Sequence, residues 1–323
     1  MIQKIYNLEQ ITLQNQHFKL TCINYGAIVQ ELIIKDKKGN DTNVILGFKE
    51  PENYLNNPYF IGASVGRFAG RISKGEFTVE DKKYPIYNEN GVHLHGGKVT
   101  FSQKYWDVEE VNETEKFVKF SYFSKHLEEG YPGNLKVSVT YKLDGNKFII
   151  TYEAETDQTT IVNLTNHNYY NLIGKDSALN HELKLNANQF LDVDQKQLAT
   201  GKFNEVANTP FDFTSTRKIG DHKDFKGIDD CFVLKNKGHI ATLYSKESGI
   251  KMNVFTNQPG VVIFTPKELP EANYSNESVN EYSSICFETQ NYPNAPNIPH
   301  FPSAELKKGE KYFNESVFEF SIR

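Results

Sequence analysis

The stretch 136–154, KVSVTYKLDGNKFIITYEA, decides the fold of this chain. Polar and apolar residues alternate from Lys136 to Leu143, which is the pattern of a strand with one buried face. Asp144-Gly145-Asn146 is a hairpin turn signal, and a second strand-like segment runs from Lys147 to Ala154. The stretch therefore predicts an antiparallel β-hairpin.

The same period-2 alternation recurs on both sides of this hairpin. It predicts two further hairpins, at 76–80 with 84–87 and at 242–245 with 250–255, and single strands at 18–24, 27–35, 43–48, 116–125 and 317–322. A short turn or helix is expected at 51–55, and the proline-rich stretch 293–302 is expected to be an extended surface connection. Frequent strands separated by turn signals favour an all-β fold, a large antiparallel sandwich or barrel, in one domain over 1–323.

Composition supports this fold class and excludes others. Phenylalanine occurs 23 times and tyrosine 18 times, whereas alanine occurs 12 times and methionine twice, so strand-forming residues outnumber good helix formers. The net charge of −5, without any basic run, argues against a nucleic-acid partner. No stretch is long and apolar enough for a membrane span or a signal segment, so we expect a cytoplasmic protein. Cys22, Cys231 and Cys286 are too few and too scattered for a disulfide framework.

Two of the nine histidines have unusual neighbours, and His95 is the first of them. His93 and His95 are expected on one face of a strand, where two imidazoles could begin a zinc site, but no spacing suggests a third ligand. Gly96-Gly97 allows a sharp bend and a close ligand approach, so a binding cleft and a tight structural turn remain alternatives. The remaining histidines lie in polar, loop-like company and are expected to be solvated: His17, His126, His181, His222, His239 and His300.

His167 is the second unusual histidine. It lies in 161–172, IVNLTNHNYYNL, where asparagine, histidine and tyrosine alternate within an apolar frame. Such side chains can bind many hydroxyls, and aromatic faces can stack on a sugar ring. A polar edge strand is the alternative interpretation.

Two carboxylates and one arginine complete the candidates. Glu288 directly follows Ile-Cys-Phe, so partial burial would raise its pKa toward the range of a general base, although an outward-facing glutamate is the alternative. Asp229 and its neighbour Asp230 precede an apolar run and mark a strand entrance. Two of the four arginines fall in 66–72, GRFAGRI, where glycines would let Arg71 reach a ligand.

Taken together, these segments resemble the galactose mutarotases, or aldose 1-epimerases. The matching motifs occur in family order along nearly the whole chain: NYGA at 24–27, GRFAGRI at 66–72, HLHGG at 93–97, 163–172, GIDDCF at 227–232, FETQ at 287–290, FPS at 301–303 and LKKGEKY at 306–312. The resemblance implies a large antiparallel β-sandwich that interconverts the α and β anomers of free aldohexoses, typically galactose and glucose, without metal or other cofactor.

The resemblance also implies a role for each candidate residue. Glu288 would be the general base at the anomeric hydroxyl, and His167 the general acid at the ring oxygen. His95 would assist by hydrogen bonding near the reacting oxygens, while Arg71 and Asp229 would hold sugar hydroxyls. The only expected partner is the small-molecule sugar, and the protein is expected to be a monomer or homodimer.

The chain departs from many relatives at three positions, which concern substrate preference more than chemistry. Gly70 stands where many have asparagine, Asp230 where many have histidine, and Val262 where many have glutamine. All three are expected beside the pocket. A hexose-6-phosphate epimerase and a non-catalytic sugar-binding protein are the alternative functions. Four arginines give little material for a phosphate clamp, and an intact acid and base would be unnecessary for binding alone.

Overall fold

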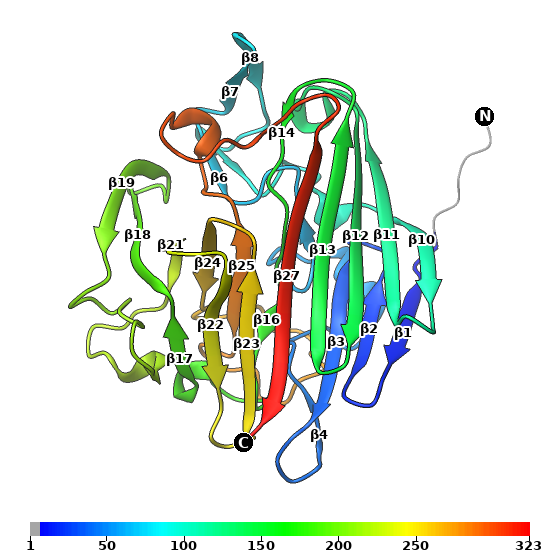
Figure 1. Ribbon diagram of the computed structural model, residues 1–323, viewed down its shortest axis with the longest axis vertical. Helices are drawn as coiled ribbons and strands as arrows, with labels where there is room; N and C mark the ends of the chain where they lie inside the picture. The colour runs from blue at the N-terminus through cyan, green and yellow to red at the C-terminus, as the bar shows by residue number, and fades with distance from the viewer. Residues whose placement is uncertain (1–6) are drawn as a thin grey trace.

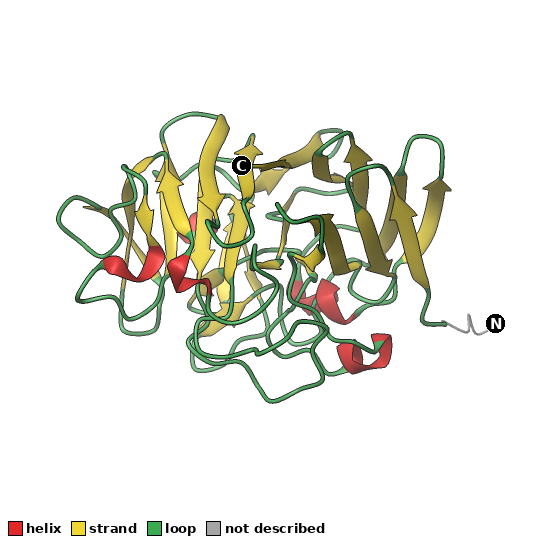
Figure 2. Cartoon of the chain, turned by 90° about the horizontal axis from the view of Figure 1, so that it is seen from below, coloured by secondary structure: helices red, strands yellow, loops and turns green. Residues whose placement is uncertain are grey.

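A computed structural model describes residues 7–323 and has an all-β architecture. Among these residues the helical segments are six short 3-10 turns, drawn in red in Figure 2. They are η1 (Pro51–Leu55), η2 (Phe101–Gln103), η3 (Glu128–Gly130), η4 (Ala178–Asn180), η5 (Ile219–Asp221) and η6 (Ala295–Asn297). Within the described range, no helix is long and apolar enough to cross a membrane.

A nine-stranded antiparallel sheet forms one layer and runs across the front of Figure 1. In spatial order its strands are β10 (Asp107–Asn112), β11 (Phe117–Ser124), β12 (Leu135–Asp144), β13 (Lys147–Thr156), β27 (Lys311–Ile322), β23 (Ile250–Thr256), β22 (Gly238–Tyr244), β17 (Glu182–Leu185) and β20 (Arg217–Lys218). The longest ladder, β12 with β13, is the hairpin that the alternation predicts, and Gly145-Asn146 makes its two-residue turn.

Two smaller antiparallel sheets lie behind this layer in Figure 1. The four-stranded sheet contains β1 (Gln10–Gln14), β2 (Lys19–Ile23), β3 (Ile28–Lys35) and β4 (Asp41–Asn43). The six-stranded sheet contains β16 (Tyr169–Tyr170), β25 (Ile285–Gln290), β24 (Gly260–Phe264), β21 (Asp229–Leu234), β18 (Ala187–Val193) and β19 (Ala199–Glu205). Both contribute buried apolar residues to the core cluster that they share with the nine-stranded sheet. The predicted antiparallel sandwich is therefore confirmed.

Four short strand pairs lie outside these three sheets in the described part of the chain. They are β5 (Ser64–Val65) with β15 (Thr165–Asn166), β6 (Arg71–Ser73) with β9 (Val92–Leu94), β7 (Glu76–Val79) with β8 (Lys82–Pro85), and β14 (Thr160–Ile161) with β26 (Glu305–Leu306). The β7–β8 hairpin was expected with a turn at 81–83. Its turn is instead Glu80-Asp81, both at positive φ, because Val79 already pairs with Lys82.

Two expectations about local structure are wrong. The segment 43–48 is not a strand beyond Asn43: Ile45 and Phe48 make only isolated bridges, and the apolar run is buried by tertiary packing. The segment 293–302 is not simply an extended surface connection. It contains η6, and its Asn294 accepts hydrogen bonds from the backbone N–H and hydroxyl of Ser73 at 3.0 Å each.

The six-stranded sheet carries two of the candidate residues, Asp229 on β21 and Glu288 on β25, and its two faces have different neighbours. Side chains alternate across a strand, so residues that pair across strands share a face. The row Phe287, Ile263 and Asp230 and the row Thr289, Val261 and Phe232 share the face toward the core. The intervening rows face the other way: Cys286, Phe264 and Asp229; Glu288, Val262 and Cys231; Gln290, Gly260 and Val233. Six of these residues line a pocket: Asp229, Cys231, Val262, Phe264, Glu288 and Gln290.

Candidate active site

A pocket of about 300 Å³ lies over this second face. Its volume is at the lower end of the range for small-molecule sites. All five candidate residues from the sequence are among the residues that line it: Arg71, His95, His167, Asp229 and Glu288. The fold thus brings together residues that lie up to 217 positions apart in the chain.

Glu288 lies at the centre of this group. It is on β25, only 2% exposed, and its Oε2 has no hydrogen-bond partner. Burial, helped by the nearby Asp229 and opposed by Arg71, raises the pKa of this carboxyl to about 8. The expected burial and raised pKa are therefore confirmed, and the outward-facing alternative is wrong.

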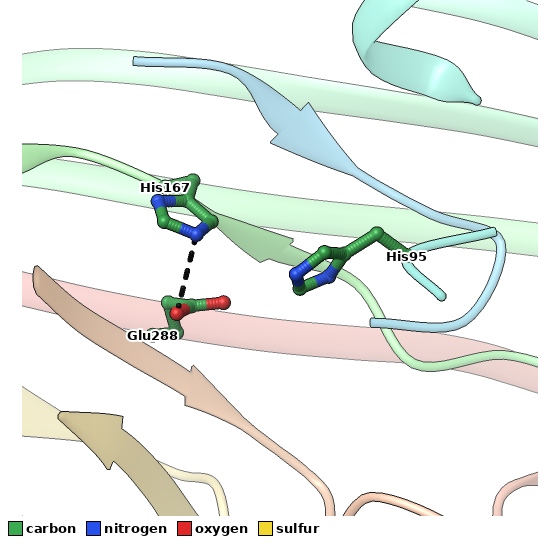
Figure 3. Close-up of side chains that lie close together, drawn as sticks. All are labelled: His95, His167 and Glu288. Atoms are coloured by element: carbon green, nitrogen blue, oxygen red, sulfur yellow. Dashed lines mark ion pairs between the residues drawn. The ribbon is translucent and has the colours of Figure 1, made fainter. Parts of the chain in front are cut away.

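His167 contacts Glu288 directly. Its Nε2 lies 3.4 Å from Glu288 Oε1, as the dashed line in Figure 3 shows. The ring lies among aromatic side chains, stacked on Tyr169 at 5.0 Å and on Phe60 at 6.1 Å between centroids. This burial lowers the pKa of His167 to about 4. His167 is thus a buried, neutral imidazole. Its segment does include an edge strand, β16, but the whole of 161–172 is buried, so it is not a solvent-facing polar edge.

His95 approaches the same point from another loop, with its ring turned toward the other two side chains in Figure 3. The backbone N–H of Gly70 donates to His95 Nδ1 at 3.2 Å, and the backbone N–H of His95 donates back to the Gly70 carbonyl at 3.0 Å. Because Nδ1 accepts, a neutral His95 carries its proton on Nε2. Burial, then the charges of His167 and Arg71, hold the pKa of His95 well below its usual range.

The Gly96-Gly97 pair serves the backbone rather than a ligand. A Cβ on Gly96 would lie 1.8 Å from the Gly66 carbonyl oxygen, and Gly96 has a φ of +99°. Only glycine fits there. The sequence left a tight structural turn and a binding cleft as alternatives. Both are present, because the turn places His95 at the pocket.

His93 does not join this group, so the shared histidine face is a wrong expectation. Its Nδ1 contacts the Tyr87 carbonyl at 2.6 Å and its Nε2 the Tyr131 hydroxyl at 2.5 Å. The side chain is fully buried. The strand ends at Leu94 and His95 has a φ of +49°, which breaks the alternation between the two histidines.

The three side chains of Figure 3 also have the composition of a metal site. Ligand atoms of His95, His167 and Glu288 all lie within 4.8 Å of one another. A metal-bound histidine normally donates its second ring N–H to an acceptor. His95 Nδ1 instead faces a donor, the Gly70 N–H, so its surroundings orient Nε2–H as a hydrogen-bond donor and do not suit a metal ligand.

The two arginines of 66–72 have separate environments. Arg71 faces the pocket, with its Nη2 3.8 Å from Asp229 Oδ2. Burial raises the pKa of Asp229 and the Arg71 charge opposes that shift. Arg67 is 2% exposed and donates to four backbone carbonyls and to the Ser124 hydroxyl. Arg67 therefore fastens the 124–133 loop to the core.

The departures from relatives do not all lie where they were expected. Gly70 and Val262 line the pocket, and Val262 is the cross-strand partner of Glu288. Asp230 is not among the lining residues, and alternation places it on the opposite face, in the row with Ile263. Burial raises the pKa of Asp230 to about 6. His181, expected in solvent, is also buried, with its Nε2 accepting from the Leu172 N–H at 2.9 Å.

Phe60 and Gln290 are among the pocket residues that sequence reasoning missed. Phe60 has a φ of +56° and lies 4.8 Å from His95 between ring centroids, and nothing in the sequence around it marks this role. Gln290 shares the pocket face of β25 with Glu288. Period-2 alternation from Glu288 was a signal that could have identified Gln290.

Comparisons with known proteins agree with this fold. The model of the aldose 1-epimerase family matches residues 9–319. Bovine (Bos taurus) galactose mutarotase is 39% identical over 98% of this chain and 94% of its own length, and aldose 1-epimerase of Escherichia coli is 31% identical over 96% and 94%. An aldose epimerase homologue from C. elegans superposes with a TM-score of 0.92 at 29% identity, covering 98% and 99% of the two chains. Galactose 1-epimerase of Lactobacillus acidophilus gives 0.87 at 30% identity, covering 98% and 95%. The chain belongs to the aldose 1-epimerase family.

Proposed function

We propose that this protein interconverts the α and β anomers of free aldohexoses, with galactose and glucose as substrates, by acid–base ring opening and reclosure. One observation carries the proposal: a buried carboxyl and a buried imidazole lie 3.4 Å apart in a pocket, with the second carboxyl oxygen unpartnered. Such a pair can remove a proton at one sugar oxygen and add a proton at another. Positioned acids and bases of this kind each contribute roughly 10²–10⁴-fold to rate.

In this mechanism Glu288 takes the proton of the anomeric hydroxyl and His167 protonates the ring oxygen. The C1–O5 bond breaks, the aldehyde rotates about C1–C2, and the roles reverse on closure. The Glu288–His167 pair must hold one proton for either half of this cycle. The pKa values of about 8 for Glu288 and about 4 for His167 give one shared proton throughout that pH range. The carboxyl–imidazole contact allows that proton to pass between the two groups.

The other three residues hold and polarise the sugar. His95 Nε2–H, oriented by the Gly70 N–H, donates to an oxygen at the reacting centre. Arg71 supplies donors and Asp229 supplies acceptors for sugar hydroxyls, and their loose 3.8 Å contact leaves room for a hydroxyl to bind both. No step requires a metal, in keeping with the donor that faces His95 Nδ1.

A phosphorylated hexose is the less suitable substrate. Among the described residues that line the pocket, Arg71 is the single lysine or arginine, and Asp229 is beside it. A phosphate group favours bidentate arginine pairs. Arg67, the neighbouring candidate, is committed to backbone carbonyls.

Polarimetry of freshly dissolved α-galactose and α-glucose tests the proposal. We expect accelerated mutarotation of both sugars, little acceleration with α-glucose 6-phosphate, and full activity after prolonged EDTA treatment. A rate equal to the uncatalysed rate would refute the enzymatic function. Loss of activity on chelation, restored by Zn²⁺, would refute the metal-free mechanism. A cytoplasmic location and a monomer or homodimer remain predictions, which cell fractionation and sedimentation would check.

A further inference from the structure

The side-chain oxygen of Gln290 is a buried hydrogen-bond acceptor that no group of the protein satisfies. Gln290 is 0% exposed, and its Oε1 has no partner. Its Nε2 donates to the Asn291 carbonyl at 3.1 Å. This contact fixes the amide orientation, because a flipped amide would bring two carbonyl oxygens together. Buried acceptors normally have a donor, so this oxygen calls for an explanation.

Among the described residues that line the pocket, two share this property. Buried, unpartnered side-chain polar atoms in the described chain belong to Thr160, Asn168, Ser283, Ser284, Glu288, Gln290 and Asn314. Of these, only Glu288 and Gln290 line the pocket. One of the two is the proposed base, whose free oxygen receives the anomeric proton. The second such oxygen therefore belongs to a residue that lines the same pocket, two residues further along the same strand.

Glycines adjoin Gln290 on two sides. Its cross-strand partner is Gly260, which has no side chain to lie over it. On another side is Gly70, where an added Cβ would lie 3.3 Å from Gln290 Nε2 and 3.0 Å from the Pro293 ring. A side chain at position 70 would therefore crowd the Gln290 amide, whereas one at position 260 would meet the Tyr292 ring at 3.0 Å.

The spacing along β25 indicates which part of a sugar Gln290 would meet. Residues two apart on a strand are separated by roughly 7 Å and point the same way. If Glu288 receives the anomeric proton, Gln290 lies too far along the strand for the same hydroxyl. A pyranose that reaches both side chains presents a ring hydroxyl at Gln290.

We propose that Gln290 Oε1 accepts a hydrogen bond from a non-anomeric ring hydroxyl of the aldose and thereby orients the sugar against Glu288. This inference rests on the proposed function for the identity of the ligand. Gln290 is a specificity-determining residue and takes no part in proton transfer. A site built around one hydroxyl discriminates against analogues that lack it, because the acceptor is then left unpaired.

Deoxygalactoses test the assignment because they keep the reacting atoms. KM and kcat would be measured for galactose and for its 2-, 3-, 4- and 6-deoxy analogues with the wild type and with Gln290→Met. With the wild type, we expect removal of the bonded hydroxyl to raise KM about 2- to 10-fold with little change in kcat. Gln290→Met should raise KM for galactose by a similar factor and abolish the penalty for that one analogue. Equal penalties in both proteins for every analogue would overturn the assignment.

A matched variant separates this role from a general loosening of the fold. Asn314 is another buried amide with an unpartnered oxygen, but it lies on β27 and does not line the pocket. Asn314→Leu should lower the melting temperature and leave the analogue penalties of the wild type unchanged. Gln290→Met should remain folded, since the Asn291 carbonyl also accepts from Asn163 Nδ2 at 3.2 Å. Selective loss of one penalty in Asn314→Leu as well would refute a specific role for Gln290.

Calorimetric titration of the same sugars gives a readout that needs no turnover. The wild type could fail to accelerate mutarotation and still bind one deoxy analogue more weakly than galactose, with Gln290→Met showing no such difference. In that case the proposed function fails and the Gln290 assignment stands. If turnover is normal and the substitution at Gln290 changes the binding penalty of no analogue, the assignment fails and the function stands.

Discussion

The two faces of the six-stranded sheet are built from the same strands and have opposite energetic character. The core face carries apolar side chains such as Phe232 and Ile263, both fully buried against the other layer. The pocket face carries Glu288 and Gln290, equally buried but each with an unpartnered oxygen. Burying an unsatisfied polar group costs free energy, whereas burying a phenylalanine or isoleucine side chain stabilises the fold. One face therefore stabilises the sheet, and the other keeps polar groups ready for a ligand.

The largest expected effect is on the pocket face, at Glu288. Glu288→Gln removes the proposed base and keeps the shape of the side chain. We expect kcat to fall roughly 10²–10⁴-fold with the fold retained. Polarimetry and circular dichroism measure the two properties. Glu153→Gln, on an exposed position of β13, is the control and should leave kcat unchanged. Mutarotation near the wild-type rate in Glu288→Gln would contradict the assignment of the base.

The opposite result is expected on the core face. Phe232 packs against Phe190 and Phe211 at 6.2 Å between ring centroids. Phe232→Ala should lower the free energy of unfolding by roughly 3–5 kcal/mol, mainly because of the cavity, and leave kcat of the folded protein nearly unchanged. Denaturant titration measures the loss. Phe123→Ala, at a side chain 49% exposed, is the control, with an expected change within about 0.5 kcal/mol. A large kcat loss with little destabilisation in Phe232→Ala would show that the faces are not separable.

The pH dependence of stability provides a direct measure of the free-energy cost of burying the ionised Glu288 carboxylate. Its pKa is raised from 4.5 in the unfolded chain to about 8 in the fold, so the folded state binds the extra proton and loses stability as pH rises between these values. His167, lowered from 6.5 to about 4, has the opposite slope below pH 6.5, which partly cancels that of Glu288. Above pH 6.5 only the Glu288 effect remains.

Glu288→Gln should therefore remove a decrease in stability between pH 6.5 and 8. A span of 1.5 pH units corresponds to about 2 kcal/mol for one proton. Denaturant titrations of wild type and variant at the two pH values give the difference, in which other titrating groups cancel. Parallel pH dependence in the two proteins would mean that Glu288 is already ionised in the fold at neutral pH.

A smaller effect is expected at His95, which we propose donates from Nε2 without transferring the proton. Asparagine tolerates the left-handed conformation of this position, where φ is +49°, so His95→Asn should fold. Loss of one hydrogen bond should lower kcat/KM by about 10-fold, well short of the Glu288→Gln effect. Steady-state polarimetry of both variants makes the comparison. A loss as large as that of Glu288→Gln would assign His95 a direct role in proton transfer.

The sequence predicts some parts of the fold and of the site well. Alternation and Asp144-Gly145-Asn146 identify the β12–β13 hairpin because local pattern and turn chemistry agree there. The position of Glu288 after Ile-Cys-Phe correctly predicts its burial, since a central strand is covered on both faces. The resemblance to the family groups candidate site residues that no local pattern in the sequence connects.

What the sequence could not show is set by tertiary contacts. Arg67 and Arg71 have similar neighbours in the chain, and only the 124–133 loop distinguishes the buried arginine from the one in the pocket. His93 and His95 separate because the strand ends between them. The apolar run 43–48 has the composition of a strand but lacks a continuous ladder partner. Such partners come from distant segments and leave no local signal.

The smallest expected effect concerns Val262, an apolar side chain on the pocket face beside the polar Glu288. Val262 pairs with Glu288 across β24 and β25 and lines the pocket, so a side chain there is beside the proposed base. A valine gives no hydrogen bond, whereas glutamine, which many relatives have here, can bind a sugar hydroxyl. One neutral hydrogen bond is worth roughly 0.5–1.5 kcal/mol, or about 2- to 10-fold in binding. We therefore expect Val262→Gln to lower KM for galactose or glucose and to leave kcat nearly unchanged, as for an interaction made equally in the ground and transition states.

Val262→Leu is the matched control for this last prediction, because leucine extends the side chain as glutamine does without adding a polar group. Asp230, on the opposite face, should not interfere with the new side chain. Gly70 keeps the far side of the pocket open, although Pro293 and Gln290 leave little spare space around it. Steady-state polarimetry over a range of both sugars decides the matter. An equal fall in KM with leucine would assign the effect to shape, and an unchanged KM with glutamine would mean that the apolar patch beside Glu288 faces no hydroxyl of either sugar.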